Sequence, residues 1–331
     1  MNALARTCSI AMCLGSIALG AMTASPASAQ EDPAKYPTRP IHIVVGFTPG
    51  GGNDILARIV GQKLSDSLGQ PVVIDNKPGG GAIVATEYVA KTAPDGYTLL
   101  VGASGAMTIN PAVYARLNYD SIRDFVPLSE LGSFPLILIV NASSPFKSVA
   151  DLVAYAKANP DKTNYSSASA AFQVATELFK QKTGAPMQEI PYKGANDSVM
   201  AVISGQVTAT IADAGPVSGQ IKGGQVRALA VAAPKRVDDL PDVPTMKEAG
   251  ADVEAVLWSG LFAPKNTPPA IVKKLEGELM KIARMPDVIE RLKPLGIDSV
   301  GNSSEEFSKI LASDIARWTA VAKAANIKIE Q

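Results

Sequence analysis

Apolar residues along this chain alternate between strand-like and helix-like spacing. Short strand-like runs occupy residues 41–45, 72–74 and 98–101, and amphipathic stretches follow the first two. The stretch after Asn53 carries one apolar helix face, made of Ile55, Leu56, Ile59, Val60, Leu64 and Leu68. Asn53 suits the N-cap of this helix and Gly69 suits its C-terminal stop. This alternation is typical of an α/β protein with largely parallel sheets.

The same alternation restarts in the middle of the chain. Further strands are predicted at residues 136–140, 163–167, 187–190, 207–212, 228–231 and 253–262. Further helices are predicted at residues 148–158, 171–182, 194–204, 267–283, 286–295 and 303–325. The last three helices have no sheet of their own, so we expect them to pack on the first sheet. The chain then forms a discontinuous domain 1 and a domain 2, hinged by two crossovers, with bounds 30–131 plus 253–331 and 132–252.

Residues 1–29 have the composition of a secretory signal peptide. Arg6 is their only charge, an apolar stretch covers residues 10–22, and Ala27-Ser28-Ala29 has the small-x-small pattern of a cleavage site. A membrane anchor needs about 20 strongly apolar residues, whereas this stretch is shorter and interrupted by two glycines and a serine. We therefore predict export with cleavage after Ala29. Both cysteines, Cys8 and Cys13, leave with the signal, so the mature chain has no disulfide or cysteine-based metal site.

Composition and charge narrow the function further. The 331 residues include 31 Lys+Arg and 31 Asp+Glu, and 47% are apolar, which provides ample core for two domains of about 150 residues. A net charge of zero provides no basic footprint for nucleic acid or an anionic membrane. We expect a monomer that binds neither of these partners.

Known catalytic and nucleotide-binding patterns are incomplete in this sequence. His42 is the only histidine and lies in a predicted strand, so no His-based triad or zinc cluster is available and a structural role is expected. The glycine-rich junctions lack the Lys-Ser/Thr of a phosphate-binding loop and the third glycine of a dinucleotide fingerprint. Ser144-x-x-Lys147 and Lys182-Thr183-Gly184 match two penicillin-recognition motifs, but the intervening Ser-Asp-Asn is absent. We expect no enzyme activity, cofactor or metal.

Two triple-glycine junctions remain as candidate chemistry, each between a strand and a helix. They are residues 50–52 and 79–81. Backbone N–H groups at a helix N-terminus can converge on an anion, where the helix dipole adds partial positive charge. The carboxyl ends of neighbouring parallel strands meet at one edge of a sheet, so the junctions should lie side by side. They predict a carboxylate site, to which Thr48 and Ser104 could add hydroxyl donors; the alternative is that the glycines merely form tight turns.

Two further residues have alternative roles. Asp54 lies in the first turn of the predicted helix, where it either complements the helix dipole or holds a ligand amine or an ordered water. Trp258 belongs either to the core or to a flat wall across the cleft.

Six motifs in order resemble one family over essentially the whole mature chain. They are Phe47-Thr48-Pro49-Gly50-Gly51-Gly52-Asn53-Asp54, Asn76-Lys77-Pro78-Gly79-Gly80-Gly81, Ala93-Pro94-Asp95-Gly96-Tyr97-Thr98-Leu99-Leu100, Pro191-Tyr192-Lys193-Gly194, Arg227-Ala228-Leu229-Ala230-Val231 and Leu240-Pro241-Asp242-Val243-Pro244-Thr245. Together they resemble the Bug, or tripartite tricarboxylate transporter (TctC-type), family of periplasmic solute-binding receptors. The resemblance implies a two-domain, type II Venus-flytrap periplasmic-binding-protein fold. Such a receptor closes on a small organic acid in the periplasm and delivers it to a membrane transporter of one large and one small subunit.

The resemblance also implies a set of ligand-binding residues. Backbone amides and ordered waters of the first two junctions hold a ligand carboxylate in that family, and a third loop and a segment near Asp213 face the cleft. With Ser104 and Trp258 added, the ligand-binding candidates are Phe47, Thr48, Pro49, Gly50, Gly51, Asn53, Asp54, Gly80, Gly81, Ala82, Ile83, Ser104, Ser167, Ala168, Ser169, Ala170, Phe172, Asp213 and Trp258.

Departures from the family pattern indicate which acid is bound. The second junction continues Gly81-Ala82-Ile83 where the family usually has Gly-Gly-Asn, and the third loop contains Phe172 where it is usually glycine-rich and polar. Ile83 and Phe172 favour a pocket less polar than one for citrate or an acidic amino acid. An aromatic dicarboxylate such as terephthalate is the first candidate, with adipate-like or nicotinate-like acids next and citrate and acidic amino acids as alternatives.

Two other functions remain open at this stage. The same receptor could present its ligand to a membrane sensor rather than a transporter. An enzyme could use the glycine junctions to hold a carboxylate substrate, with Asp54 or Asp213 as general base.

Overall fold

The computed structural model describes residues 34–192 and 194–329, so the predicted signal peptide lies outside the described residues. The strands are β1 (Ile41–Val45), β2 (Val72–Asn76), β3 (Thr98–Ala103), β4 (Phe125–Asn141), β5 (Asn164–Ser167), β6 (Gln188–Pro191), β7 (Ala209–Asp213), β8 (Val226–Val231), β9 (Val256–Pro264) and β10 (Asp298–Ser299). The α-helices are α1 (Gly52–Leu68), α2 (Ile83–Ala90), α3 (Asn110–Val113), α4 (Val149–Ala158), α5 (Ala170–Thr183), α6 (Ala195–Ile203), α7 (Ala214–Lys222), α8 (Pro269–Ala283), α9 (Pro286–Leu292) and α10 (Ser304–Ala324). Short helical turns are η1 (Gly80–Ala82), η2 (Gly105–Ile109), η3 (Pro160–Lys162) and η4 (Lys293–Leu295).

The sheet confirms the predicted α/β class. Its strand order is β2-β1-β3-β9-β4-β7-β5-β6, with β10 and β8 also paired to β4. The outer strands are parallel, since β1 pairs β2 and β3, and β5 pairs β6 and β7, in the same direction. The two central strands depart from the expected parallel arrangement, because β9 runs antiparallel to both β3 and β4.

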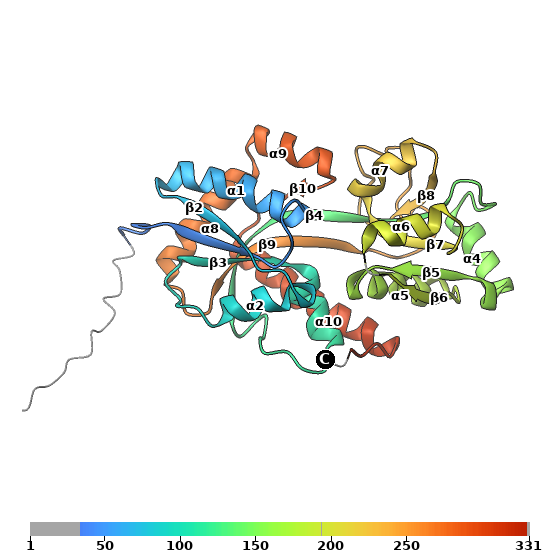
Figure 1. The fold of residues 1–331 in the computed structure, drawn as a ribbon, viewed down its shortest axis with the longest axis horizontal. Coiled ribbons are helices and arrows are strands. Elements are labelled where there is room, and N and C mark those ends of the chain that lie inside the picture. The colour runs from blue at the N-terminus through green and yellow to red at the C-terminus, as the bar shows by residue number, and fades with distance from the viewer. Residues whose placement is uncertain (1–33, 193, 330–331) are drawn as a thin grey trace, which may run out of the picture. The chain divides into compact units, whose positions relative to one another are not determined.

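β4 and β9 join the two ends of the sheet (Figure 1). They pair from Phe125 opposite Pro264 to Pro135 opposite Val256, and the rest of β4 pairs β7 and β8. The sequence predicted only residues 136–140 of β4, because prolines and glycines interrupt its first half. The division of the chain at residues 131/132 and 252/253 stays a prediction, and β4 runs through the first of these positions without a break.

Helices cover both faces at each end of the sheet. At the β1 end, one apolar cluster joins strand residues such as Ile43 to Leu56 of α1 and Leu275 of α8. A second cluster joins Phe262 of β9 to Phe307 of α10. The two clusters place the C-terminal helices on the first strands of the chain, so the glycine junctions stand on a sheet packed from both sides.

Local signals at the helix ends were only partly diagnostic. Gly69 ends α1 with φ of 68°, as predicted, and its N–H donates to Ser65. The predicted N-cap Asn53 is wrong, because α1 begins at Gly52 and Gly51 is the N-cap. The Asn53 side chain instead accepts a hydrogen bond from Ser259 of β9. Within the described part of the chain, no helix has both the length and the apolar content that a bilayer crossing demands.

The single histidine lies on a strand, as predicted. His42 is on β1, and its Nδ1 lies 2.8 Å from a carboxylate oxygen of Asp75 on the neighbouring strand β2. This contact between adjacent strands fits a structural role.

Candidate functional site

The first junction connects β1 to α1 through an exposed loop. Gly51 is extended, with φ of −77° and ψ of 164°, and no side chain caps the helix start. Residues 48–52 are all exposed. Because the first N–H groups of an α-helix have no intrahelical partner, the start of α1 presents uncapped donors. Anions bind at such positions.

Asp54 holds this loop in shape. Its buried carboxylate accepts hydrogen bonds from Gly50 N at 2.9 Å, Arg58 Nε at 2.9 Å and Asn76 Nδ2 at 2.9 Å. Asn76 also donates to Phe47 O at 3.0 Å. Burial alone would raise the pKa of Asp54, but these hydrogen bonds outweigh it, so the pKa lies below its ordinary value. The carboxylate therefore acts on its own loop, a role that the sequence did not reveal.

The second junction connects β2 to α2 and is shaped by backbone conformation. Gly79, Gly80, Gly81 and Ala82 have consecutive positive φ values of 144°, 56°, 62° and 71°. Ala82 is the N-cap of α2 and makes no side-chain cap. The glycines are exposed, while Ala82 is buried. This run of left-handed residues explains why glycine fills most of the junction, because side chains with a Cβ are strained there.

The two junctions lie side by side, because Asn76 at the end of β2 donates to Phe47 O and to Asp54 beside the first junction. Gly46, which follows β1, also lies against the second junction, since a Cβ added to it would be only 2.3 Å from the Ala82 Cβ. Asn110 Nδ2 also donates to Gly81 O at 3.1 Å, which ties the second junction to α3. The expectation that the two junctions lie side by side is met.

Ser104 follows β3, and its hydroxyl and carbonyl oxygens accept hydrogen bonds from within the protein. It is 1% exposed, and its Oγ accepts a hydrogen bond from Trp258 N at 3.1 Å. Its carbonyl accepts one from Thr108 Oγ1 at 2.7 Å. A Cβ added to the next residue, Gly105, would lie 4.0 Å from Ala171 of α5. This places the start of η2 beside the start of α5.

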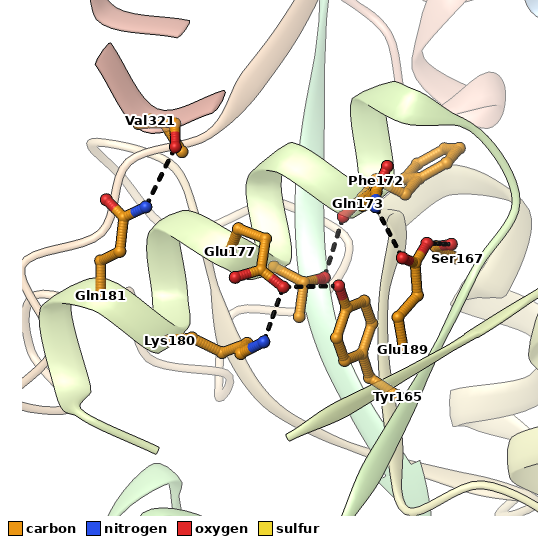
Figure 2. A network of polar contacts seen from close by, with 10 residues as sticks. Tyr165, Ser167, Phe172, Gln173, Glu177, Lys180, Gln181, Glu189 and Val321 are labelled. Carbon is orange, nitrogen blue, oxygen red and sulfur yellow. Dashed lines mark hydrogen bonds and ion pairs between the residues drawn. The ribbon is translucent and has the colours of Figure 1, made fainter. Parts of the chain in front are cut away.

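The third predicted loop, residues 166–172, covers the end of β5, the two connecting residues 168 and 169, and the start of α5. Ser167 Oγ and Gln173 Nε2 both donate to the carboxylate of Glu189, the latter at 2.6 Å (Figure 2). Ser169 is the exposed N-cap of α5, again without a side-chain cap. Phe172 is partly buried and packs on the neighbouring apolar cluster. The loop thus presents one more uncapped helix start.

Asp213 ends β7 and precedes α7. It lines a cavity of about 340 Å³ with Asn196 of α6 and Met200. No side-chain cap is formed at this helix start. Burial raises the pKa of Asp213 to about 6, since the charged carboxylate is poorly solvated there.

Two predicted site residues lie in the core. Ile83 is 6% exposed and belongs to the apolar cluster that contains Phe262. Trp258 is 3% exposed, and its Nε1 donates to Asp314 at 2.7 Å. Its ring also packs edge-on against Phe307, with centroids 5.0 Å apart. The structure thus favours the core alternative for Trp258, and it does not bring Ile83 to the exposed surface of the junction.

A larger cavity of about 750 Å³ lies against α10, away from the glycine junctions. Among the predicted site residues it shares Trp258. The sequence offered no signal for this cavity, because its walls come from strands and loops distant along the chain.

Comparison with known proteins agrees with the fold and gives the class of protein, a solute-binding receptor. Residues 56–327 match the profile of the tripartite tricarboxylate transporter family receptor, and the chain belongs to this family. Protein BugT of Bordetella pertussis is 35% identical over 299 residues, which cover 89% of this chain and 92% of BugT.

Solved structures of similar proteins include two with bound acids. Rpa4515 of R. palustris with adipate is 35% identical, with a TM-score of 0.79, covering 89% of this chain and 100% of that one. MatC of Rhodopseudomonas palustris with bound malate is 30% identical, with a TM-score of 0.74, covering 86% of this chain and 99% of that one. These similarities confirm the family that the six motifs resembled.

Proposed function

We propose that this protein is a periplasmic receptor that captures a small organic carboxylate and delivers it to a tripartite membrane transporter. The observation that carries the proposal is that two helix starts without side-chain caps follow the neighbouring parallel strands β1 and β2. The adipate and malate bound by the two relatives support the class of ligand. Export with cleavage after Ala29, action as a monomer and large and small permease subunits as partners belong to the same proposal.

Capture begins at the junctions. One ligand carboxylate accepts hydrogen bonds from the first N–H groups of α1 and α2, where both helix dipoles stabilise negative charge. The uncapped start of α5, beside η2, supplies donors to the rest of the ligand. Closure around β4 and β9 then excludes water and strengthens each of these hydrogen bonds.

The identity of the acid depends on the side chains around it. The apolar character inferred for the pocket rested on Ile83 and Phe172, and Ile83 lies in the core. Phe172 remains to support a flat ligand such as terephthalate. Adipate becomes a stronger candidate, because the structure of a 35% identical relative contains adipate. We therefore propose a dicarboxylate, with terephthalate and adipate as the first two acids to test.

The rival functions make distinct predictions. In the enzyme alternative, Asp54 would be a poor general base, because both its oxygens accept hydrogen bonds and its pKa is lowered. Asp213, whose pKa is raised to about 6, is the better base candidate. A receptor returns its ligand unchanged, so chemical conversion of a tightly bound acid would replace our proposal. A sensor partner instead of a transporter would leave ligand binding unchanged.

The first experiment measures the melting temperature of residues 30–331 with terephthalate, phthalate, benzoate, nicotinate, adipate, citrate, aspartate and glutamate. A ligand at about 100 times its Kd stabilises the native state by about 2.7 kcal/mol, which a melting curve resolves. A shift with terephthalate alone supports the apolar pocket, and a shift with adipate supports an aliphatic dicarboxylate. A shift with citrate or glutamate would still support a carboxylate receptor but would contradict the apolar pocket inferred from Phe172. No shift with any acid, after unfolding and refolding to remove a bound ligand, would contradict the proposal.

Gly51→Val tests the first junction itself. The extended backbone of Gly51 accepts a β-branched residue, and a Cβ there would meet only Thr48 O at 3.6 Å. The two additional methyl groups would cover the start of α1, so binding should be lost while the protein still melts cooperatively. Gly51→Ala is the matched control and should retain most of the affinity. Normal binding by Gly51→Val would remove the first junction from the site.

A further inference from the structure

The cavity of about 750 Å³ against α10 is separate from the glycine junctions. Its walls come from β4, β9, β10, α10 and the segment that follows β8. β4 carries Ser133 and Pro135 into it, and β9 carries Val256 and Trp258. An occupant would therefore contact the two strands that join the ends of the sheet.

A buried carboxyl group lines this cavity without a cationic partner. Glu130 of β4 is 6% exposed. One of its oxygens accepts a hydrogen bond from Asn302 Nδ2 at 3.2 Å, and its backbone N–H donates to Asn302 Oδ1 at 2.9 Å. Within residues 34–192 and 194–329, no ion pair involves Glu130. Burial, offset in part by the hydrogen bond from Asn302 and reinforced by the charge of Asp314, raises the pKa of Glu130 to about 7. Its ionised form therefore lacks a counter-charge.

Asp314 of α10 lines the same cavity but, unlike Glu130, has a cationic partner. It is 9% exposed, but Arg317 donates to it at 2.8 Å and the indole of Trp258 at 2.7 Å. A buried carboxylate needs such donors to offset its desolvation. Glu130 has a single amide donor instead of a cation, and this difference marks it as the group that a ligand could complete.

Exposed cations stand at the edge of the cavity. The side chains of Lys235, Arg236 and Lys309 are 75%, 44% and 72% exposed. Each already pairs with an acidic residue, Asp298, Glu248 or Glu305 in that order. The exposed carboxylates of Asp298 and Glu254 also line this edge, so it carries both signs of charge. The buried floor, in contrast, holds Glu130 without a cation. A dicarboxylate would be opposed by Glu130, and a simple amine would leave the edge cations without a ligand contact.

We propose that this cavity is a second binding site, for a small zwitterion that places a primary ammonium on Glu130 and its carboxylate against the edge cations Lys235, Arg236 and Lys309. The ammonium supplies the charge and the N–H donors that Glu130 lacks. The carboxylate meets the edge cations as a further hydrogen-bond acceptor. The site thus selects a class of ligand that differs from the dicarboxylates proposed for the junctions.

Calorimetric titration with 4-aminobutyrate at pH 8 tests the proposal directly. Butyrate lacks the ammonium and butylamine lacks the carboxylate, so both should bind at least about tenfold more weakly. Glu130→Gln keeps the size and the hydrogen-bonding capacity toward Asn302, and it should weaken 4-aminobutyrate binding at least about tenfold. Glu254→Gln is the matched control, because Glu254 lines the same cavity but is exposed. It should change affinity less than about threefold.

The pH dependence provides a second measurement that needs no variant. Binding should weaken as pH falls through about 7, because protonated Glu130 no longer attracts an ammonium. The charged groups that face Glu130 across the cavity are Asp314, Arg317 and Lys309 of α10, Asp298 of β10, Glu254, Lys235 and Arg236. Glu130→Gln should abolish this dependence between pH 6 and about 8. If Glu130→Gln does not fold, the pH dependence of 4-aminobutyrate binding by the wild type tests the proposal alone.

Each contrary result overturns the proposal. No heat of binding with 4-aminobutyrate at pH 8 would show that the cavity takes no zwitterion. Equal binding of butyrate would define an anion site at the edge, and equal binding by Glu130→Gln would remove Glu130 from the contact. Gly51→Val should still bind 4-aminobutyrate, so loss of binding in that variant would place the zwitterion at the junctions instead.

Discussion

The junctions that begin α1 and α2 occupy equivalent places in the fold but are held by different forces. Asp54 fixes the first through hydrogen bonds to Gly50, Arg58 and Asn76. The second is fixed by four consecutive residues with positive φ. A side-chain network tolerates changes in the loop backbone but depends on one carboxylate, whereas a left-handed backbone favours glycine, which fills three of these four positions. The two junctions should therefore respond differently to the same substitutions.

The contact shared by both junctions should be the most sensitive. Gly46→Ala would place a Cβ 2.3 Å from the Ala82 Cβ and 2.8 Å from its Cα, so backbone must move. We expect a loss of about 2–3 kcal/mol in the free energy of unfolding, measured by urea denaturation. Gly277→Ala is the control, because no atom lies within 4 Å of its added Cβ and it is inside helix α8. That control should be neutral or stabilising by up to about 1 kcal/mol.

Asp54→Ala should disrupt the first junction selectively. Removal of three hydrogen bonds to a buried carboxylate should cost about 2 kcal/mol of stability and weaken carboxylate binding at least about tenfold. Asp66→Ala, an exposed position on the same helix, should stay within about 0.5 kcal/mol of the wild type. Unchanged binding by Asp54→Ala would show that the loop keeps its shape without the network.

The difference in stability between the wild type and Asp54→Ala should also depend on pH in a predictable direction. The pKa of Asp54 is lowered in the folded state, so its contribution to stability is present above the ordinary value of 3.8. It disappears as pH falls through the folded-state pKa. The difference between wild type and Asp54→Ala should therefore narrow below about pH 4 in urea titrations. A constant difference down to about pH 2 would contradict this assignment.

Single glycine-to-alanine substitutions should distinguish the two junctions through smaller changes in stability. Gly81→Ala places a Cβ at φ of 62° in ordinary contact with the Asn110 side chain, 3.7 Å away, so only backbone strain of about 1 kcal/mol is expected. Gly51→Ala, at φ of −77°, should change stability by less than about 0.5 kcal/mol. Equal melting temperatures for Gly81→Ala and Gly51→Ala would contradict the proposal that the two junctions are held by different forces.

Salt should have the smallest effect, because both junctions offer backbone N–H groups rather than free cations. Raising the ionic strength from about 0.05 M to 0.5 M should weaken carboxylate binding less than about threefold. Titration of the acid identified by melting would measure this. A steep dependence on salt would point to lysine or arginine as the main ligand contact.

The sequence predicted those features whose cause is local. Strand and helix spacing predicted the alternation, and glycine runs after strands predicted both junctions. The network around Asp54 escaped prediction because Asn76 and Asp54 belong to different elements that meet only in the fold. The first half of β4 was missed because Pro127 and Pro135 resemble breaks, although they lie in a strand with register shifts.

Side-chain direction was the least predictable property. Only Ala82 separates Ile83 from the glycines, yet the left-handed turn before it sends the Ile83 side chain into the core. Trp258 alternates with Ser259 along β9, and the two residues therefore lie on opposite faces. Ser259 contacts Asn53 at the first junction, while Trp258 contacts Asp314. A shift of one residue in register would have exchanged these roles.

The position of β9 between β3 and β4 also has a consequence for how the chain folds during synthesis. Leu100 pairs with Phe262, so the β1–β3 segment cannot complete its sheet until most of the polypeptide has been made. Helices α8 and α10, which cover that sheet, are made later still. On the nascent N-terminal third, α1 and α2 can cover part of these strands, but the apolar surface that α8 and α10 cover stays exposed. Contacts of such sequence separation form slowly. We expect this protein to acquire its native core only after translation, with a long interval in which chaperones can bind it.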